Sequence, residues 1–367
     1  MKKNKAKKVF LAMSGGVDSS VAAVILLRQG FDVTGVYMKN FSEESFDGKF
    51  AEYCPWRRDL ADVKKVCRIL KIPMKVYNFE KEYNRRVIDD FFEKERKALT
   101  PNPDVVCNNE IKFGLFLKKA LSDGADFIAT GHYAKITEKK LRTGKQKVIV
   151  RAKDSNKDQT YFLCGLKPSQ IQKALFPLGN YTKPEIRKIA RASGLPTAEK
   201  QESMGICFVG EVDFEEFLKA RISETPGEIV DTQGKILGLH KGLSFYTIGQ
   251  RQGLNISGPV PYYVVRKLKK KNQLVVVSGS KASELFARAV EVTGLSWAVA
   301  NPGRLPLNCR VSIRYRQKPQ NAILRQKDKK VIIEFRSRQR AITPGQYCAI
   351  YDRRLLLGGA VIKHEYV

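Results

Sequence analysis

The sequence predicts an N-terminal α/β domain built on a parallel sheet, followed by an all-β part that ends in a small barrel. Up to about residue 222, apolar runs of strand length alternate with stretches of helical spacing, which is typical of a parallel sheet with helices on both faces. From about Pro226 onward, short apolar runs separated by glycines replace the helical periodicity. A chain of 367 residues with 43% hydrophobic residues can form two or three such domains.

The expected elements follow the chain in order. We expect the strands of the α/β domain at residues 9–13, 32–38, 74–77 and 125–130, and its helices at residues 21–27, 59–70, 87–99, 109–121 and 183–193. A short helix at residues 213–222 precedes the all-β part, whose strands we expect at residues 262–265, 274–277, 311–316, 331–335, 347–351 and 355–362. Ligands of parallel sheets bind where the strands end, so the loops at residues 14–19, 38–40 and 131–133 should meet in one site.

The loop Ser14-Gly15-Gly16-Val17-Asp18-Ser19 joins the first strand to the first helix and indicates an anion site. Two adjacent glycines allow a tight turn and a close approach of backbone to ligand, and the helix N-terminus that follows presents free N–H groups. Asp18 could hold a metal ion that carries the phosphate charge. The loop fits neither the Walker pattern nor the dinucleotide fingerprint. The alternative is an ordinary serine-capped helix start after a buried strand.

The charge balance favours a polyanionic partner, with nucleic acid as the first candidate. Lysine and arginine number 67 against 37 aspartates and glutamates, a net charge of +30. The basic residues recur along most of the chain rather than in one tail, which fits an extended binding face; general solubility is the alternative. No apolar run is long enough to span a membrane, so we expect no membrane partner and a cytoplasmic location.

Two of the seven cysteines differ from the rest, because Cys107 and Cys207 fall in expected loops while most of the others should be small buried side chains. No Cys-x-x-Cys pair is present, so no zinc site is expected. Pro101 and Pro103 should exclude helix from the loop that holds Cys107, and Asp104 lies three residues before this thiol. Two thiols across one cleft would suit sulfur or disulfide exchange, but unrelated cysteines explain the pattern equally well.

Nine motifs that span nearly the whole chain resemble those of the tRNA-specific 2-thiouridylases, a family of the ATP pyrophosphatase superfamily. They lie, in the family's order, at residues 12–20, 38–40, 102–108, 130–133, 158–163, 203–208, 249–251, 314–316 and 344–346. The sequence departs from the family pattern at Arg251-Gln252, where two adjacent arginines are usual, and so lacks one charge in a presumed tRNA-facing loop.

The resemblance implies a three-domain fold and a reaction. Residues 1–210 would form a Rossmann-like ATP-binding domain, residues 211–285 a central tRNA-contacting domain and residues 286–367 a β-barrel. ATP would adenylate the C2 oxygen of the wobble uridine of lysine, glutamate and glutamine tRNAs, with Mg²⁺ neutralising charge. Sulfur from a cysteine persulfide would then replace that oxygen to give 2-thiouridine, and AMP and pyrophosphate would leave. A cysteine desulfurase or a sulfur-relay protein would supply the sulfur.

The resemblance also implies roles for individual residues. Cys207 would carry the persulfide, Cys107 would resolve the intermediate by a disulfide with Cys207, and Asp104 would act as general acid or base, with a loop-capping role as its alternative. The implied nucleotide contacts are Ala12, Met13, Ser14, Gly15, Gly16, Val17, Asp18, Ser19, Met38 and Gly131. The implied tRNA contacts are Asn102, Pro103, Asp104, His132, Lys157, Asp158, Gln159, Arg314, Tyr315 and Gln346, and a loop-positioning role is the alternative for His132.

Three other functions share parts of this pattern. An amide ligase or amidotransferase on the same loop would need neither Cys107 and Cys207 nor the large positive charge. A tRNA lysidine synthetase would adenylate RNA but would also not need the two thiols. A non-catalytic RNA-binding protein with a relic nucleotide site would not need an intact loop, Asp104 or either cysteine. Neither the oligomeric state nor a bound iron–sulfur cluster follows from the sequence.

Overall fold

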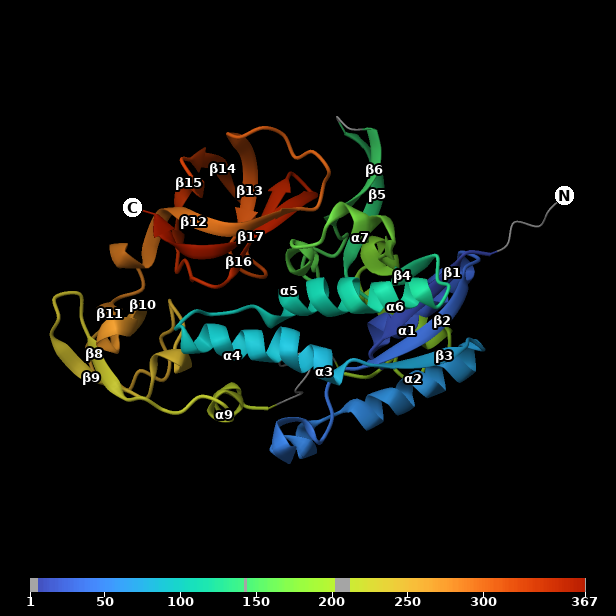
Figure 1. Cartoon of the computed structure of the whole chain (residues 1–367), viewed down its shortest axis with the longest axis horizontal. Helices are drawn as coiled ribbons and strands as arrows, with labels where there is room; N and C mark the ends of the chain where they lie inside the picture. The colour runs from blue at the N-terminus through green and yellow to red at the C-terminus, as the bar shows by residue number, and fades with distance from the viewer. Residues whose placement is uncertain (1–5, 142–143, 202–211, 367) are drawn as a thin grey trace.

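A parallel five-stranded sheet forms the centre of the N-terminal part of the chain. The structure, a computed structural model, describes residues 6–141, 144–201 and 212–366. The strand order is β3 (Met74–Asn78), β2 (Asp32–Lys39), β1 (Lys8–Met13), β4 (Phe127–Ala129) and β7 (Ala174–Leu175). All four strand pairs are parallel, as the alternation of strands and helices predicts. Figure 1 shows this sheet at the N-terminal end of the molecule.

Helices cover both faces of the sheet, which confirms the predicted layers. One face packs on α1 (Val17–Arg28), α2 (Trp56–Leu70) and α8 (Lys183–Ala192), through β1 residues such as Val9 and Leu11. The other face, which includes Phe10, packs on α3 (Glu80–Tyr83), η3 (Asn84–Ile88), α4 (Asp89–Arg96), α5 (Pro103–Cys107), η4 (Asn108–Phe116) and α6 (Leu117–Ser122). Both faces of β1 are therefore buried, which explains its continuous apolar run.

The segment between β2 and α2 is rich in aromatic residues and folds as the short turns η1 (Ser45–Gly48) and η2 (Ala51–Tyr53). Its Phe46 lies 5.9 Å from Phe92 of α4 and 5.2 Å from Phe217 of α9 (Phe214–Lys219), measured between ring centroids. This aromatic cluster holds the insertion against the helical layer. Shorter elements complete the region: η5 (Thr160–Leu163), α7 (Pro168–Gln172) and η6 (Pro177–Asn180).

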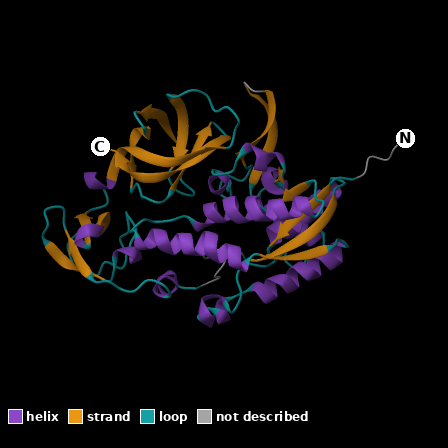
Figure 2. Ribbon diagram, in the orientation of Figure 1, coloured by secondary structure: helices purple, strands orange, loops and turns teal. Residues whose placement is uncertain are grey.

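Two β structures follow, as the change of pattern near Pro226 predicts. A four-stranded sheet has the order β10 (Tyr262–Leu268), β11 (Gln273–Ser278), β8 (Gly227–Val230) and β9 (Ile236–His240), and η8 (Lys269–Lys271) joins β10 to β11. The turns η7 (Leu243–Phe245) and η9 (Ser283–Leu285) flank it. The last six strands are β12 (Phe286–Trp297), β13 (Leu307–Ser312), β14 (Gln320–Lys327), β15 (Lys330–Arg340), β16 (Tyr347–Asp352) and β17 (Leu355–Tyr366), and pairing of β12 with β17 closes them into a barrel. Figure 2 shows this all-strand composition.

The α/β part and the barrel are joined by a common sheet and a common apolar cluster. The hairpin of β5 (Ala134–Leu141) and β6 (Gly144–Arg151) leaves the α/β part and joins the barrel sheet through Val150 and Leu355 (Figure 1). Buried barrel residues such as Ala349 and Tyr351 belong to the same apolar cluster as Phe10. The division at residues 1–210, 211–285 and 286–367 stays a prediction. No helix within the described part of the chain is long and apolar enough to cross a membrane.

Two local predictions are wrong. Residues 101–108 are not an extended loop, because Pro103 to Cys107 form α5; proline is tolerated at the first helical position, and the Asn102 side chain caps the helix. The strand predicted at residues 311–316 ends at Ser312. Arg316 has a φ of +64°, a left-handed conformation that a strand does not adopt.

Candidate active site

The loop between β1 and α1 forms a cradle of backbone groups. Gly16 is the N-cap of α1, and no side chain caps the N–H groups at this helix end. Gly15 has a φ of +74°, and a Cβ there would lie 2.7 Å from the backbone oxygen of Asp59, so only glycine fits. An uncapped helix N-terminus next to a side-chain-free turn suits a phosphate group.

Two of the three serines of this loop use their hydroxyls in hydrogen bonds to the backbone. The hydroxyls of Ser19 and Ser20 donate to the Gly16 carbonyl at 3.1 and 2.9 Å, and the Ser14 N–H donates to Ser19 Oγ. The side chain of Ser14 is exposed. Of the three hydroxyls, only that of Ser14 is therefore presented to a ligand at the mouth of the cradle.

Asp18 pairs with a lysine that the sequence analysis did not single out. Lys183 Nζ, at the first position of α8, lies 2.8 Å from Asp18 Oδ1 and 2.9 Å from Oδ2. The Tyr133 hydroxyl donates to Asp18 Oδ1 at 2.9 Å. The capping box of Thr182 and Glu185 fixes the start of α8. An ammonium group is thus held beside the N-terminus of α1, which adds positive charge where the helix dipole already favours an anion.

A second lysine ties the chain before residue 202 to the cradle. Lys200 Nζ donates to the Gly15 carbonyl at 3.1 Å and to the carboxylates of Asp59 and Asp62 at 2.8 and 2.7 Å. Lys200 precedes residues 202–211, which lie outside the described residues and include Cys207. The cradle is therefore connected to the segment that leads to the second candidate cysteine.

The loop after β4 closes the other side of the cradle. A Cβ on Gly131 would lie 2.9 Å from the backbone nitrogen of Ser19, so the two segments touch at a position where no side chain fits. Met38, half-buried, is the next-to-last residue of the neighbouring strand β2. The three loops thus follow adjacent strands of the sheet, and their meeting in one site is supported for the loops at residues 14–19 and 131–133.

His132 is buried in this loop. Its Nδ1 lies 2.7 Å from Thr130 Oγ1, and its ring lies 6.1 Å from Phe113 and 5.9 Å from Phe176, measured between centroids. Burial, and then the charge of Lys112, hold the pKa of His132 well below its usual value. These bonds support its loop-positioning role, and its contact with tRNA stays a prediction.

Cys107 and Asp104 lie one turn apart on α5. Asn102 Oδ1 accepts a hydrogen bond from the Val105 N–H at 3.2 Å and so caps the helix. The spacing of three residues places the half-buried Asp104 and the buried Cys107 on the same side of the helix. Burial raises the pKa of the Cys107 thiol; the Asp104 carboxylate adds to this shift, and Lys112 and a hydrogen bond with Tyr83 oppose it.

A barrel residue braces this helix from the far end of the chain. Gln346 Nε2 donates to the carbonyls of Thr100 and Pro101 at 3.2 and 3.0 Å, and Gln346 Oε1 accepts from Asn102 Nδ2 at 3.2 Å. The Thr100 N–H also donates to the Pro344 carbonyl at 2.9 Å. Asn102 and Gln346 therefore have an internal role, and the tRNA contacts implied for them and for Pro103 stay predictions.

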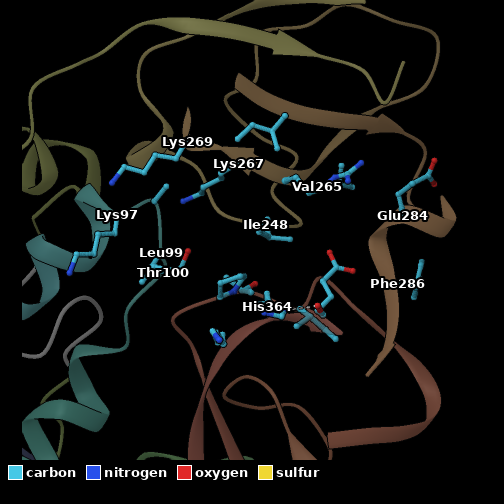
Figure 3. A pocket seen from close by; sticks show the side chains of 18 of the residues that line it. Lys97, Leu99, Thr100, Ile248, Val265, Lys267, Lys269, Glu284, Phe286 and His364 are labelled. Atoms are coloured by element: carbon cyan, nitrogen blue, oxygen red, sulfur yellow. Dashed lines mark hydrogen bonds between the residues drawn. The ribbon is translucent and has the colours of Figure 1, made fainter. Parts of the chain in front are cut away.

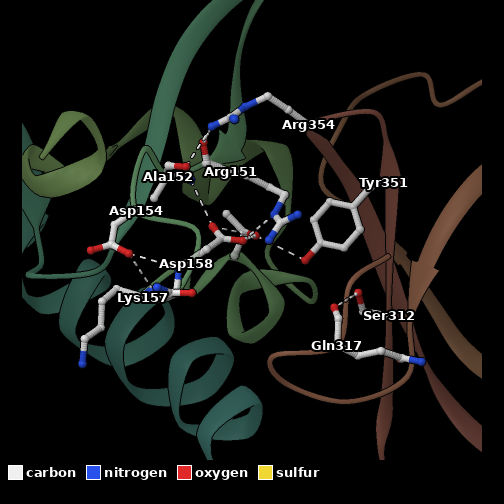
Figure 4. A network of polar contacts seen from close by, with 11 residues as sticks. Arg151, Ala152, Asp154, Lys157, Asp158, Ser312, Gln317, Tyr351 and Arg354 are labelled. Carbon is white, nitrogen blue, oxygen red and sulfur yellow. Dashed lines mark hydrogen bonds and ion pairs between the residues drawn. The ribbon is translucent and has the colours of Figure 1, made fainter. Parts of the chain in front are cut away.

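Residues 157–159 lie at a junction of the α/β part and the barrel (Figure 4). The Asp158 carboxylate, 6% exposed, accepts bonds from Arg151 Nε at 2.6 Å and from the Ala152 N–H at 3.0 Å. Gln159 Oε1 accepts a bond from the Tyr133 N–H at 2.9 Å. The structure thus uses Asp158 and Gln159 internally, whereas Figure 4 shows the Lys157 side chain pointing away from Asp158. tRNA contacts of all three stay predictions.

The barrel loop after β13 reaches the same junction. Tyr315 packs against Phe162 with ring centroids 4.4 Å apart and ring planes tilted by 42°, and Asn108 Nδ2 donates to the Phe162 carbonyl at 3.2 Å. Arg314 is exposed and donates to the Arg340 carbonyl at 3.2 Å. The residue after Cys107 is therefore linked through Phe162 to the implied tRNA contact Tyr315.

The residues present fit a phosphate ligand better than a metal cage built by protein alone. Among the described residues, no group of three His, Cys, Asp or Glu side chains is arranged to hold a metal ion. Asp18 is the carboxylate of the cradle, and its side chain remains 32% exposed beside Lys183. Mg²⁺ typically takes one or two carboxylates plus substrate phosphates, which one exposed carboxylate at an anion cradle can satisfy.

Family models match almost the whole chain. They are described as "tRNA methyl transferase HUP domain" over residues 7–211, "tRNA methyl transferase PRC-barrel domain" over residues 215–278, and "Aminomethyltransferase beta-barrel domain" over residues 287–362. The first alone spans more than half of the chain.

Curated relatives match over nearly their full lengths. The "tRNA-specific 2-thiouridylase MnmA" of Legionella pneumophila (strain Philadelphia 1) is 46% identical over 97% of this chain and 98% of its own. The protein of the same name from Limosilactobacillus reuteri is 45% identical over 100% of this chain and 98% of its own. A solved 4-thiouridine synthetase–RNA complex with bound ATP is 19% identical, with a TM-score of 0.34 over 58% of this chain and 50% of that one, a likeness too low to carry an inference.

Proposed function

The chain belongs to the family of tRNA-specific 2-thiouridylases, and we propose that it replaces the C2 oxygen of the wobble uridine of tRNA with sulfur at the expense of ATP. The observation that carries the proposal is the continuous contact between the anion cradle and the thiol helix. Gly131 touches Ser19 of the cradle, and its neighbour His132 packs on Phe113, in the helical segment that continues α5.

The cradle would bind the ATP phosphates. A C2 oxygen is a poor leaving group until it is adenylated, and adenylation requires pyrophosphate to leave with its negative charge stabilised. The N–H groups at the start of α1 and the ammonium of Lys183 are positioned to take up that charge. Mg²⁺, when held by the phosphates and Asp18, would supply further charge neutralisation. Ala12, Met13 and Val17 support this cradle from the buried side, and Met38 lies near the end of the adjacent strand β2.

The thiols would deliver sulfur in two steps. The terminal sulfur of a Cys207 persulfide would attack the adenylated C2, and the C–O bond to AMP would break. The Cys107 thiolate would then attack Cys207 Sγ, so that the sulfur–sulfur bond breaks, the sulfur stays on the uridine and the two cysteines are oxidised to a disulfide. A thiol reductant must reduce that disulfide before the next turnover. The persulfide itself would come from a cysteine desulfurase or a sulfur-relay protein.

Asp104 would manage the proton of this step. Cys107 is a weaker acid than a free cysteine because it is buried, so it needs a base before it can attack. Asp104 lies one turn before it on the same side of α5. Asn108, the next residue after Cys107, has a buried Oδ1 with no hydrogen-bond partner among the described residues. Uracil carries an N3–H donor that would satisfy this acceptor once the base has left its stack.

The test is thiolation of an unmodified lysine tRNA transcript with Mg-ATP and a sulfur source, read as a shift in a mercury gel. Wild type and Cys309→Ala, which changes a buried barrel cysteine, should thiolate the tRNA. Cys107→Ala and Cys207→Ala should bind the tRNA but not thiolate it. If wild type binds tRNA and hydrolyses ATP without thiolation, even with a desulfurase present, the proposal is wrong.

A further inference from the structure

A cavity outside the candidate active site holds none of the nucleotide-binding, thiol or tRNA-contacting residues assigned above. It has a volume of about 710 Å³ and lies where the end of α4, the strand β10 and the barrel strand β17 meet. Figure 3 shows Lys97 and Leu99 on one side of the cavity and Glu284 and Phe286 on the other. Its volume is typical of a site for a small ligand.

One of the lysines that line this cavity has a buried ammonium group. Lys267 contributes to the lining, and its Nζ is shielded from solvent and has no hydrogen-bond partner among the described residues. Glu95 of α4 is the opposite charge that acts on it, without forming an ion pair. Burial lowers the pKa of Lys267 and raises the pKa of Glu95. A shielded ammonium without a partner is costly, so an anionic group in the cavity would satisfy it.

Cationic side chains line one side of the cavity, and an aromatic ring and a carboxylate line the other side. Lys269 adds a second cation on the side of Lys267, and both side chains extend from the β10 end toward the segment at residues 97–100 (Figure 3). On the far side, Phe286 offers an aromatic ring, and Glu284 offers a carboxylate. Cations suit a phosphate, an aromatic ring stacks on a base, and a carboxylate accepts the N–H groups of a base edge.

We propose that this cavity is a second nucleotide site, with the phosphate on Lys267 and Lys269 and the base against Phe286. The nucleotide could be part of the bound tRNA outside the target uridine, in which case the inference rests on the proposed function, or it could be a free nucleotide. Its wall includes Thr100, two residues before the cap of α5, and Thr100 is bonded through its backbone to Pro344 and Gln346. A nucleotide bound here would brace the segment that positions Asp104 and Cys107.

The test compares two lysines in the full-length protein, Lys267 in β10 and Lys271 at the end of the following turn η8. Lys267→Met removes the shielded charge, and Lys271→Met removes an exposed charge four residues away that does not line the cavity. tRNA binding is measured as a function of salt, and binding of uridine 5′-monophosphate is measured by calorimetry. Phe286→Leu serves as a second variant that keeps the charge, and thermal unfolding checks that each variant folds.

A tRNA nucleotide in the cavity predicts roughly ten- to hundred-fold weaker tRNA binding for Lys267→Met. The slope of log affinity against log salt should also fall by about 0.7 to 0.9, the share of one phosphate. Phe286→Leu should weaken binding without changing that slope. A free nucleotide predicts instead that Lys267→Met loses uridine 5′-monophosphate while tRNA binding is unchanged. If Lys267→Met matches Lys271→Met in both assays, the second site does not exist; thiolation by wild type tests the proposed function separately.

Discussion

Replacing Lys183 with methionine tests whether its ammonium group acts on the leaving pyrophosphate. The change keeps most of the side-chain volume at a position where only 11% of the side chain is exposed. It removes the group that lies 2.8 and 2.9 Å from the two oxygens of Asp18. Asp18 then keeps the hydrogen bond from Tyr133 but loses its counter-charge.

The expected effects differ in size for stability and for rate. The Asp18 side chain of the Lys183–Asp18 pair is 32% exposed, so solvent screens the pair. Breaking it should therefore lower the unfolding free energy by about 1 to 2 kcal/mol. The rate should fall more. Removing one preorganised donor to a developing negative charge typically lowers kcat by about 10²- to 10³-fold. We expect kcat to fall in this range while the Kd for tRNA is unchanged.

The assay is tRNA-dependent pyrophosphate release, with thiolation measured in parallel. Lys153→Met is the matched control, since Lys153 pairs with Glu185 of the same helix α8 at 2.8 Å but is 53% exposed. It should change stability by less than about 0.5 kcal/mol and leave the rate unchanged. If Lys183→Met releases pyrophosphate within about threefold of the control rate, Lys183 only supports the fold and the role assigned to it is wrong.

Three further predictions follow from neighbouring contacts. Gly131→Ala should abolish ATP binding, measured by calorimetry, while the protein still folds. The reason is that the new Cβ would lie 2.9 Å from the backbone nitrogen of Ser19 and would push the two loops apart. Normal ATP binding would show that the two loops can separate without loss of the site. His132 stays neutral when folded but gains a proton on unfolding, so its contribution to stability falls as pH drops below about 6.5, by at most about 1.4 kcal/mol per pH unit. Urea unfolding should show a smaller loss between pH 7.5 and 5.5 for His132→Gln, and an equal loss in both proteins would contradict the buried neutral ring. Gln346→Ala should lower the unfolding free energy by about 1 to 3 kcal/mol and slow thiolation, because the carbonyls of Thr100 and Pro101 lose their hydrogen-bond donor. Unchanged thiolation would show that the barrel does not position α5.

Local patterns in the sequence determined the strands, the helices and the anion loop. Apolar periodicity and glycine pairs act over a few positions, which is why β1, α1 and α8 could be predicted directly from the sequence. The same local reasoning failed at residues 101–108. Two prolines do not exclude a helix when one of them occupies its first position behind an asparagine cap.

Only the tertiary structure decided which side chains complete the site. Lys183 lies 165 residues from Asp18 in the chain, and Gln346 lies 246 residues from Thr100, so no spacing along the sequence could connect them. The internal role of Asp158 could not be predicted either. The sequence does not tell whether a carboxylate is solvated or, as here, paired with Arg151. The sequence by itself thus determined which chemical groups are present and which local elements form. Both depend only on residue type and on local backbone preference. Packing of α8, the barrel and the α/β sheet decided which of those groups act together, because ion pairs and hydrogen bonds form only where folding brings distant segments within about 3 Å.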